Sequence, residues 1–370
     1  MGGAAIPVLS VIAVTRLMPE NRRGTAIGVL SAASGAGAGA GPAIGGGIGQ
    51  FLGWPALFWI MLVLALVLFL AVARILPDEA PQAPGGLDLL GGVLLGLGAG
   101  LALFGITQAQ VSGWAAPASW ASLVVAAAAF AAFAWRTVRI PQPFVSPALF
   151  ANPVYRSAVV VAFLAMAVNL GGLVFVPLMM VDVNGAGPGV GALAMIPAGI
   201  AVAAVSPLIG RLTDRIGTRP LVLTGLAVMG LFALFLSTFT AGVSVLPAGI
   251  GILGFSVGFI LVITALVAAA AGELPADQTG AGMGVLQGAQ FLGAGGGPAL
   301  LGALVAARQQ SGGGAVNPLF PDLDGAAYSD AFLAMAVVAA VTWIVAFRTR
   351  GTGTRSSADR LPQASEESSA

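Results

Sequence analysis

The side chains that could do chemistry in this 370-residue chain belong to few types. The sequence has no histidine, cysteine or lysine; its basic residues are fifteen arginines, and its acidic residues number fourteen. Metal sites and nucleophile–base pairs need histidine, cysteine or clustered acids, and no apolar segment of this chain holds a pair of acids. We therefore expect no enzyme, no metal ion and no cofactor. The kinds of chemistry that remain possible are proton binding by a carboxylate and hydrogen bonding by side-chain amides.

One carboxylate and three amides occupy or border long apolar segments. Asp182 follows the apolar segment 157–181. A titratable group that lines a membrane pathway can carry protons, so Asp182 is the candidate for proton coupling; the alternative is a solvated charge at a helix end. Asn169, Gln287 and Gln290 are candidates for binding a substrate, and the two glutamines lie three residues apart on one helix face. The alternative for these amides is hydrogen bonding between helices.

A glycine pattern occurs twice in the chain, 256 residues apart. The first copy comprises Gly28, Gly37, Gly41, Pro42, Gly45 and Gly46, and the second comprises Gly284, Gly293, Gly297, Pro298 and Gly302. Each copy lies inside a long apolar segment, where its proline removes a backbone hydrogen bond and bends a helix. We predict two kinked helices whose smooth faces pack against each other across an internal symmetry and gate a pathway. The alternative is ordinary close packing through small residues.

The composition is that of a protein embedded in lipid. Hydrophobic residues make up 58% of the chain and charged residues 8%, whereas about a quarter of a soluble protein is charged. A net charge of +1 offers nucleic acid no basic surface. Segments of about 20 apolar residues can span a membrane. Eleven segments qualify, at 2–17, 25–50, 54–75, 88–109, 117–136, 157–181, 189–211, 220–240, 244–272, 280–307 and 329–348. The predicted fold class is all-α and integral to the membrane.

The arginines are distributed unevenly between the connections of these segments. Alternate connections and the tail hold fourteen of the fifteen arginines, and the remaining connections hold Arg308 alone. Because cytoplasmic loops carry an excess of arginine, the sequence predicts a multi-pass protein of the bacterial plasma (inner) membrane with a cytoplasmic C-terminus. The tail is polar and is expected to be disordered.

The spacing of the two glycine helices predicts the domain organisation. They are the second and tenth predicted spans, whereas a plain duplication of six-helix halves would place them six apart. Two extra helices therefore lie between the halves, and three helices of the second half have no partner in the first. We expect a whole protein of fourteen helices. Its parts here are the remainder of an N-terminal bundle at 1–80, two linker helices and a loop at 81–150, a C-terminal six-helix bundle at 151–348, and a cytoplasmic tail at 349–370.

These motifs resemble those of the major facilitator superfamily, in particular its branch of fourteen-helix drug:proton antiporters. The first glycine pattern matches that branch's signature G-x8-G-x3-G-P-x2-G-G, and the segment 210–220 looks like the superfamily's loop signature. Stretches that look like the fourteen-helix tetracycline exporters of Gram-positive bacteria, and related multidrug exporters, lie at 19–28, 143–147 and 176–183. The chain differs from the tetracycline exporters at Val181, where they have Lys, and at Ala294, where they have Glu.

The loop signature places charges at a helix boundary. Its residues are Gly210, Asp214, Arg215, Gly217 and Arg219. We expect Asp214 to lie near a helix N-terminus, where the helix dipole favours a carboxylate, and to pair with arginine as a latch that holds one conformer. The alternative is a solvated loop that only fixes the topology.

The resemblance implies a proton-coupled secondary transporter that exports amphipathic drugs, such as tetracycline-like compounds, by alternating access. The implied partners are a small-molecule substrate, protons and the lipid bilayer, and a monomer is the expected state. One alternative is an exporter of a native secondary metabolite or siderophore. Others are a truncated remnant that does not transport and a membrane-embedded enzyme, which the absence of histidine, cysteine and paired acids opposes.

Overall fold

The computed structural model describes most of the chain after residue 51. The described residues are 52–75, 88–113, 115–140, 143–187, 190–191, 194–240, 244–274, 278–320 and 325–348, with nine single positions before residue 52. Strands are absent from this part of the chain. Its helices are α3 (Trp54–Ile75), α4 (Leu89–Ser112), α5 (Pro117–Arg139), α6 (Pro147–Ala151), α7 (Pro153–Asp182), α9 (Ile196–Ile216), α10 (Thr218–Phe239), α11 (Val245–Glu273), α12 (Thr279–Ser311) and α13 (Ala326–Arg348).

Eight of these helices are long and apolar enough to cross a membrane, which confirms the predicted all-α membrane fold. They are α3, α4, α5, α7, α10, α11, α12 and α13, and each coincides with one predicted span. The predicted spans 2–17 and 25–50 lie outside the described residues, apart from single positions. The total number of spans therefore stays a prediction.

The predicted span 189–211 and the long helix observed there have different bounds. The helix observed here, α9, runs from Ile196 to Ile216. A proline in its first turn suits a helix start, because the missing N–H would have no partner there. At the other end Gly217 has φ +84°, a left-handed conformation that ends the helix and begins the next one. The helix therefore begins about two turns, and ends about one and a half turns, after the corresponding bounds of the predicted span.

Asn152 fixes the start of α7, the longest helix of the core after α12. Its side-chain oxygen accepts hydrogen bonds from the backbone N–H groups of Val154 and Tyr155, at 2.9 and 3.4 Å, as a helix cap does. Its Nδ2 donates to Glu273 at the end of α11, at 2.9 Å. The helix therefore begins at Pro153, four residues before the predicted start, and its first turn is tied to α11.

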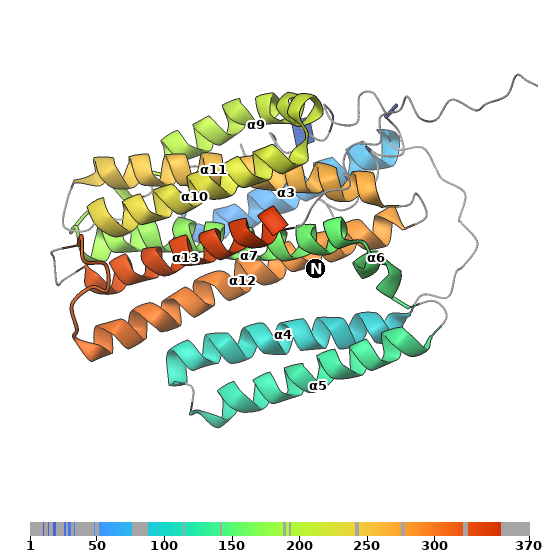
Figure 1. Ribbon diagram of the computed structural model, residues 1–370, viewed down its shortest axis with the longest axis horizontal. Helices are drawn as coiled ribbons and strands as arrows, with labels where there is room; N and C mark the ends of the chain where they lie inside the picture. Colours follow the sequence, from blue (N-terminus) through green and yellow to red (C-terminus); the bar gives the residue numbers. More distant parts are fainter. Residues whose placement is uncertain are drawn as a thin grey trace, which may run out of the picture.

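Helix α7 lies at the centre of a group of six helices. It packs directly against α11, α12 and α13, while α10 packs against α11 and α13, and α9 packs against α11 (Figure 1). Tyr155, Phe255 and Phe332 are among the largest fully buried side chains of this core. Helices α4 and α5 form a hairpin that contacts the group through α4 and α12 (Figure 1). This hairpin thus lies at the edge of the six-helix group.

The alternating helix directions give the molecule two chemically different ends. Helices α7, α10 and α12 begin at the end where α5, α9 and α13 finish, on the right in Figure 1. Arg139, Arg156, Arg215 and Arg219 lie there, in the first or last turn of their helices, and we call it the Arg-rich end. Arg308 lies in the last turn of α12 at the opposite end, which we call the Arg308 end.

Glycines allow α10 and α11 to approach closely. A Cβ built on Gly258 would lie 2.7 Å from the backbone nitrogen of Met229, and one on Gly225 would lie 2.7 Å from the carbonyl oxygen of Gly258. Such contacts with backbone atoms cannot be relieved by turning a side chain. Small residues at this crossing therefore set the distance between the two helices, as is common in membrane proteins.

Substitution of these glycines tests the crossing. We expect Gly258→Ala to push α10 and α11 apart and to lower the free energy of unfolding by about 1–3 kcal/mol. Gly272→Ala is the matched control on the same helix, because a Cβ there meets open space, and alanine favours the helix by up to about 1 kcal/mol. Thermal unfolding of the purified protein in detergent measures both. Equal unfolding temperatures for the two variants would contradict the crossing.

Candidate functional site

Helix α12 carries the second copy of the glycine pattern and lies directly against α7. A Cβ on Gly293 would overlap the carbonyl oxygen of Phe163, and one on Gly297 would overlap that of Ala167. The two glycines are four residues apart, as are their two partners, so one face of α12 rests on one face of α7 along a full turn. The backbones of the two helices touch without intervening side chains.

This contact decides what Gly293 and Gly297 do in the described part of the chain. They pack against α7, within the same six-helix group, as small-residue packing predicts. The symmetry-related partner face, Gly28, Gly37, Gly41, Pro42, Gly45 and Gly46, lies outside the described residues. Pro298 lies inside α12, which continues to Ser311. Gating by the two copies therefore stays a prediction.

The three candidate amides lie on α7 and α12. Asn169 and Gln290 are each 7% exposed, whereas Gln287 is half-buried. The Nε2 atom of Gln290 is fully buried and has no hydrogen-bond partner among the described residues. Gln290 precedes Gly293 by one turn, and both lie toward the Arg-rich end of α12. An amide donor inside the apolar bundle is thus free to bind an acceptor.

Asp182 ends α7 at the Arg308 end. It is exposed, and its carboxylate accepts a hydrogen bond of 2.5 Å from the hydroxyl of Tyr328, which is only 2% exposed and lies in the first turn of α13. The ring of Phe175 packs against that tyrosine ring, with centroids 6.5 Å apart. The sequence gives no sign of the Asp182–Tyr328 contact, because 146 residues separate the two positions.

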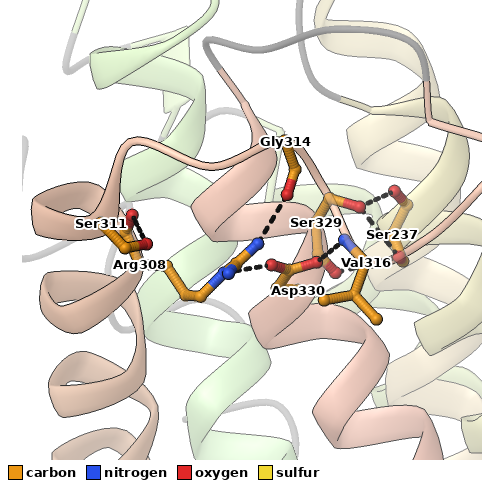
Figure 2. Close-up of polar contacts among 7 residues, drawn as sticks. All are labelled: Ser237, Arg308, Ser311, Gly314, Val316, Ser329 and Asp330. Atoms are coloured by element: carbon orange, nitrogen blue, oxygen red, sulfur yellow. Dashed lines mark hydrogen bonds and ion pairs between the residues drawn. The ribbon is translucent and has the colours of Figure 1, made fainter.

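A buried ion pair at the same end was not expected from the sequence. Arg308 Nε donates to Asp330 Oδ2 at 2.6 Å, and a second guanidinium nitrogen donates to the carbonyl oxygen of Gly314 at 2.6 Å (Figure 2). The other carboxylate oxygen accepts the N–H of Val316 at 2.7 Å. Asp330 is 6% exposed. The signal that could have found this pair was Arg308 itself, the arginine that lies apart from the other fourteen.

The predicted latch residues lie on the last turns of α9 and the first turn of α10. Gly210, Asp214 and Arg215 are all within α9, and Asp214 is in its last turn, four residues before α10 begins at Thr218. The expected place of its carboxylate near a helix N-terminus stays a prediction. The side chain of Asp214 lies outside the described part of the structure. The helix continues through the signature because the chain turns only at Gly217. A latch made by Asp214 stays a prediction.

Arg219 contacts α13 at the Arg-rich end. One guanidinium nitrogen donates to the carbonyl oxygen of Phe347 at 2.8 Å, and the guanidinium lies 5.6 Å from the centre of that phenylalanine ring. A cation at the last turn of a helix is favoured by the helix dipole. Arg219 therefore links the start of α10 to the end of α13.

A second ion pair joins α4 and α5 at the Arg-rich end. Asp88 caps α4 by accepting the N–H of Gly91 at 2.8 Å, and it also binds Arg136 Nε at 2.9 Å and the N–H of Phe144 at 3.3 Å. These donors, Gly91 first, hold the pKa of Asp88 below its ordinary value of 3.8, although burial acts in the opposite direction. The carboxylate therefore stays ionised and locks the hairpin.

Acid should weaken this hairpin. A carboxyl whose pKa falls on folding stabilises the fold above its unfolded pKa, and this stabilisation is lost as the pH falls through the folded pKa. We expect the unfolding temperature of the wild type to fall more steeply than that of Asp88→Asn between about pH 5 and about pH 2. Thermal unfolding across this range measures the difference. Parallel pH curves for the two proteins would contradict the assignment.

The sequence matches known proteins along most of its length. The family model described as the Major Facilitator Superfamily matches residues 1–298 and 158–367. The multidrug resistance protein Stp of Mycobacterium tuberculosis is 30% identical over 311 residues, which cover 83% of this chain and 57% of that protein. The tetracenomycin C resistance and export protein of Streptomyces glaucescens is 30% identical over 317 residues, covering 85% and 57%. The lincomycin resistance protein LmrB of Listeria monocytogenes is 26% identical over 246 residues, covering 66% and 52%. The chain spans little more than half the length of these relatives.

Proposed function

The chain belongs to the Major Facilitator Superfamily, and from that premise we propose that the protein exports amphipathic drugs across the bacterial plasma membrane by alternating access, in exchange for protons. One observation carries the proposal: two relatives at 30% identity are named for multidrug resistance and for tetracenomycin C resistance and export. The eight apolar membrane-length helices fit a carrier in the bilayer. The described residues hold no cluster of His, Cys, Asp or Glu for a metal ion.

The proposed organisation assigns each part of the chain a place in such a transporter. The six-helix group of α7 and α9–α13 is the C-terminal half, 151–348, and α4 and α5 are the linker helices of 81–150. The segment 1–80 belongs to the other half, and 349–370 is a cytoplasmic tail. With the Arg-rich end in the cytoplasm, the Arg308 end faces outward. The substrate binds between the halves of a monomer.

Gln290 supports a polar binding position in the C-terminal half. An unpartnered amide donor in an apolar interior has lost its bonds to water, which costs several kcal/mol on an apolar reference. A carbonyl or hydroxyl oxygen on a bound drug would restore one bond. Gln287 is half-buried one turn away and Asn169 is buried on α7. We propose these three amides as hydrogen-bonding partners of the substrate.

Asp182 supports a proton site at the outward end. Its described partner is the neutral hydroxyl of Tyr328, and Arg308, the arginine at the same end of the bundle, is bonded to Asp330. A proton can therefore bind Asp182 without breaking an ion pair between described residues. Because the carboxylate is exposed at the end of α7, protons can reach it from one side of the membrane.

A second candidate function is the export of a metabolite that the cell itself makes. The similarity to the tetracenomycin C resistance and export protein favours it. Such a transporter would use the same helices and the same proton coupling, and would differ in the breadth of its substrates.

Resistance of a bacterial host distinguishes the two candidates. The full gene product is expressed in a strain that lacks its own drug exporters, and growth is measured against a panel of unrelated amphipathic drugs. We expect raised tolerance to several of them. Tolerance to one compound class alone would favour the metabolite exporter, and no change at a normal membrane level would contradict both.

Two variants of the proposed proton site distinguish the effect of its titratable group from the effect of its hydrogen bond. Asp182→Asn removes the titratable group, and Tyr328→Phe removes its hydrogen bond but keeps the carboxylate. We expect Asp182→Asn to reduce proton-driven export of ethidium, a cationic dye, by tenfold or more, and Tyr328→Phe to retain it with an altered pH profile. Export is measured by dye fluorescence in vesicles across a pH gradient. Wild-type export by Asp182→Asn would remove this residue from the coupling.

A further inference from the structure

One turn near the start of α13, Tyr328–Asp330, contacts three helices with three consecutive residues. Tyr328 donates to Asp182 on α7, Ser329 exchanges hydrogen bonds with Ser237 on α10, and Asp330 binds an arginine on α12. Successive residues of a helix point about 100° apart, so three neighbours can be reached from one turn. Tyr328, Ser329 and Asp330 are 2%, 1% and 6% exposed. This turn joins α7, α10 and α12 inside the bundle.

The same turn holds the connection between α12 and α13 across the Arg308 end. Asp330 accepts the N–H of Val316, and Arg308 donates to the carbonyl oxygen of Gly314, so both members of the ion pair also bind the connection (Figure 2). Asn317 reaches α10, donating to Ser237 Oγ at 2.9 Å. The connection is therefore tied to three helices and cannot move away from any of them alone.

Hydrogen bonds at the opposite end are more accessible to water. The contacts of Asn152 with Glu273 and of Arg219 with Phe347 are both exposed. The contact between the Tyr155 hydroxyl and the Gly282 carbonyl is buried, at 2.7 Å. Exposed hydrogen bonds and ion pairs contribute little to the stability of the fold, because water competes for the same groups. Among the described residues, the Arg308 end of the six-helix group therefore has more buried hydrogen bonds between helices than the Arg-rich end.

We propose that Arg308 and Asp330 are positioning residues for export: they fix the outer end of α12 against α7 and α10, so that the glycine helix moves with the rest of its half. The proposal rests on the proposed export function. Asp330 uses both oxygens, and Arg308 uses two of its three nitrogens, for contacts within the protein. We therefore place their effect on transport in the position of α12.

The Asp88–Arg136 ion pair supplies a matched control. Asp88 and Arg136 lie 2.9 Å apart, with side chains 1% and 31% exposed, while Asp330 and Arg308 lie 2.6 Å apart, with side chains 5% and 26% exposed. Both carboxylates also accept backbone N–H groups. The pairs thus match in chemistry and burial, but the control pair lies between the linker helices.

The test compares Asp330→Asn with Asp88→Asn in the full gene product, reconstituted in vesicles at equal amounts of folded protein. We expect both variants to lower the unfolding temperature by several degrees. We expect Asp330→Asn to reduce the maximal rate of ethidium export at least tenfold, with KM within about twofold of wild type, and Asp88→Asn to keep the wild-type rate. Hydrogen exchange should be faster at the amide of Val316 in Asp330→Asn alone.

The charge exchange Arg308→Asp with Asp330→Arg should recover part of the export rate, because it restores the pair but not the bond to Val316. A wild-type maximal rate for Asp330→Asn, or an equal loss for both single variants, would overturn the positioning role while leaving export intact. If the wild type itself exports neither ethidium nor any drug of the panel, the proposed function fails first. In that case, unchanged hydrogen exchange at the Val316 amide in Asp330→Asn would still refute the proposed link between Asp330 and the connection of α12 and α13.

Discussion

The backbone contact between α7 and α12 sets the distance between these helices, and the other contacts of α12 depend on that distance. In lipid, apolar surface gives helices little reason to associate, so close packing and hydrogen bonds must hold them. Gly293 and Gly297 remove the atoms that would keep α12 away from Phe163 and Ala167. Once this distance is fixed, the buried hydroxyl of Tyr155 can reach the start of α12, and the end of α12 comes within reach of α13.

The polar chemistry of the described helices gathers at their ends. Each buried carboxylate there, Asp88 or Asp330, is paired with an arginine and with backbone N–H groups, because an unpaired charge in an apolar surrounding is costly. Asp182 differs, since it is exposed and bonds to a neutral hydroxyl. The two buried carboxylates therefore hold helices together, whereas the described contact of Asp182 is a single hydrogen bond to a neutral group.

The sequence was sufficient for features that depend on local chemistry. Apolar runs located eight helices within a few residues, and Gly217 marks the turn between α9 and α10. The site depended on distant contacts: Asp182 meets Tyr328 across 146 residues, and nothing near Asp182 indicates this partner. The signature that looks like a loop lies largely within α9, because that helix continues to Ile216. Single residues determine where a helix begins and ends, whereas contacts between residues of different helices depend on how the helices pack.

For the proposed export function, we expect α12 to work only while its backbone rests on α7. The most direct measurement is the rate of ethidium export by Gly297→Ala and Gly288→Ala, at equal membrane levels of the full gene product. A Cβ at Gly297 meets the backbone of Ala167, and one at Gly288 meets open space. We expect the export rate of Gly297→Ala to fall at least tenfold and that of Gly288→Ala to equal the wild-type rate. Equal rates for the two variants would contradict it.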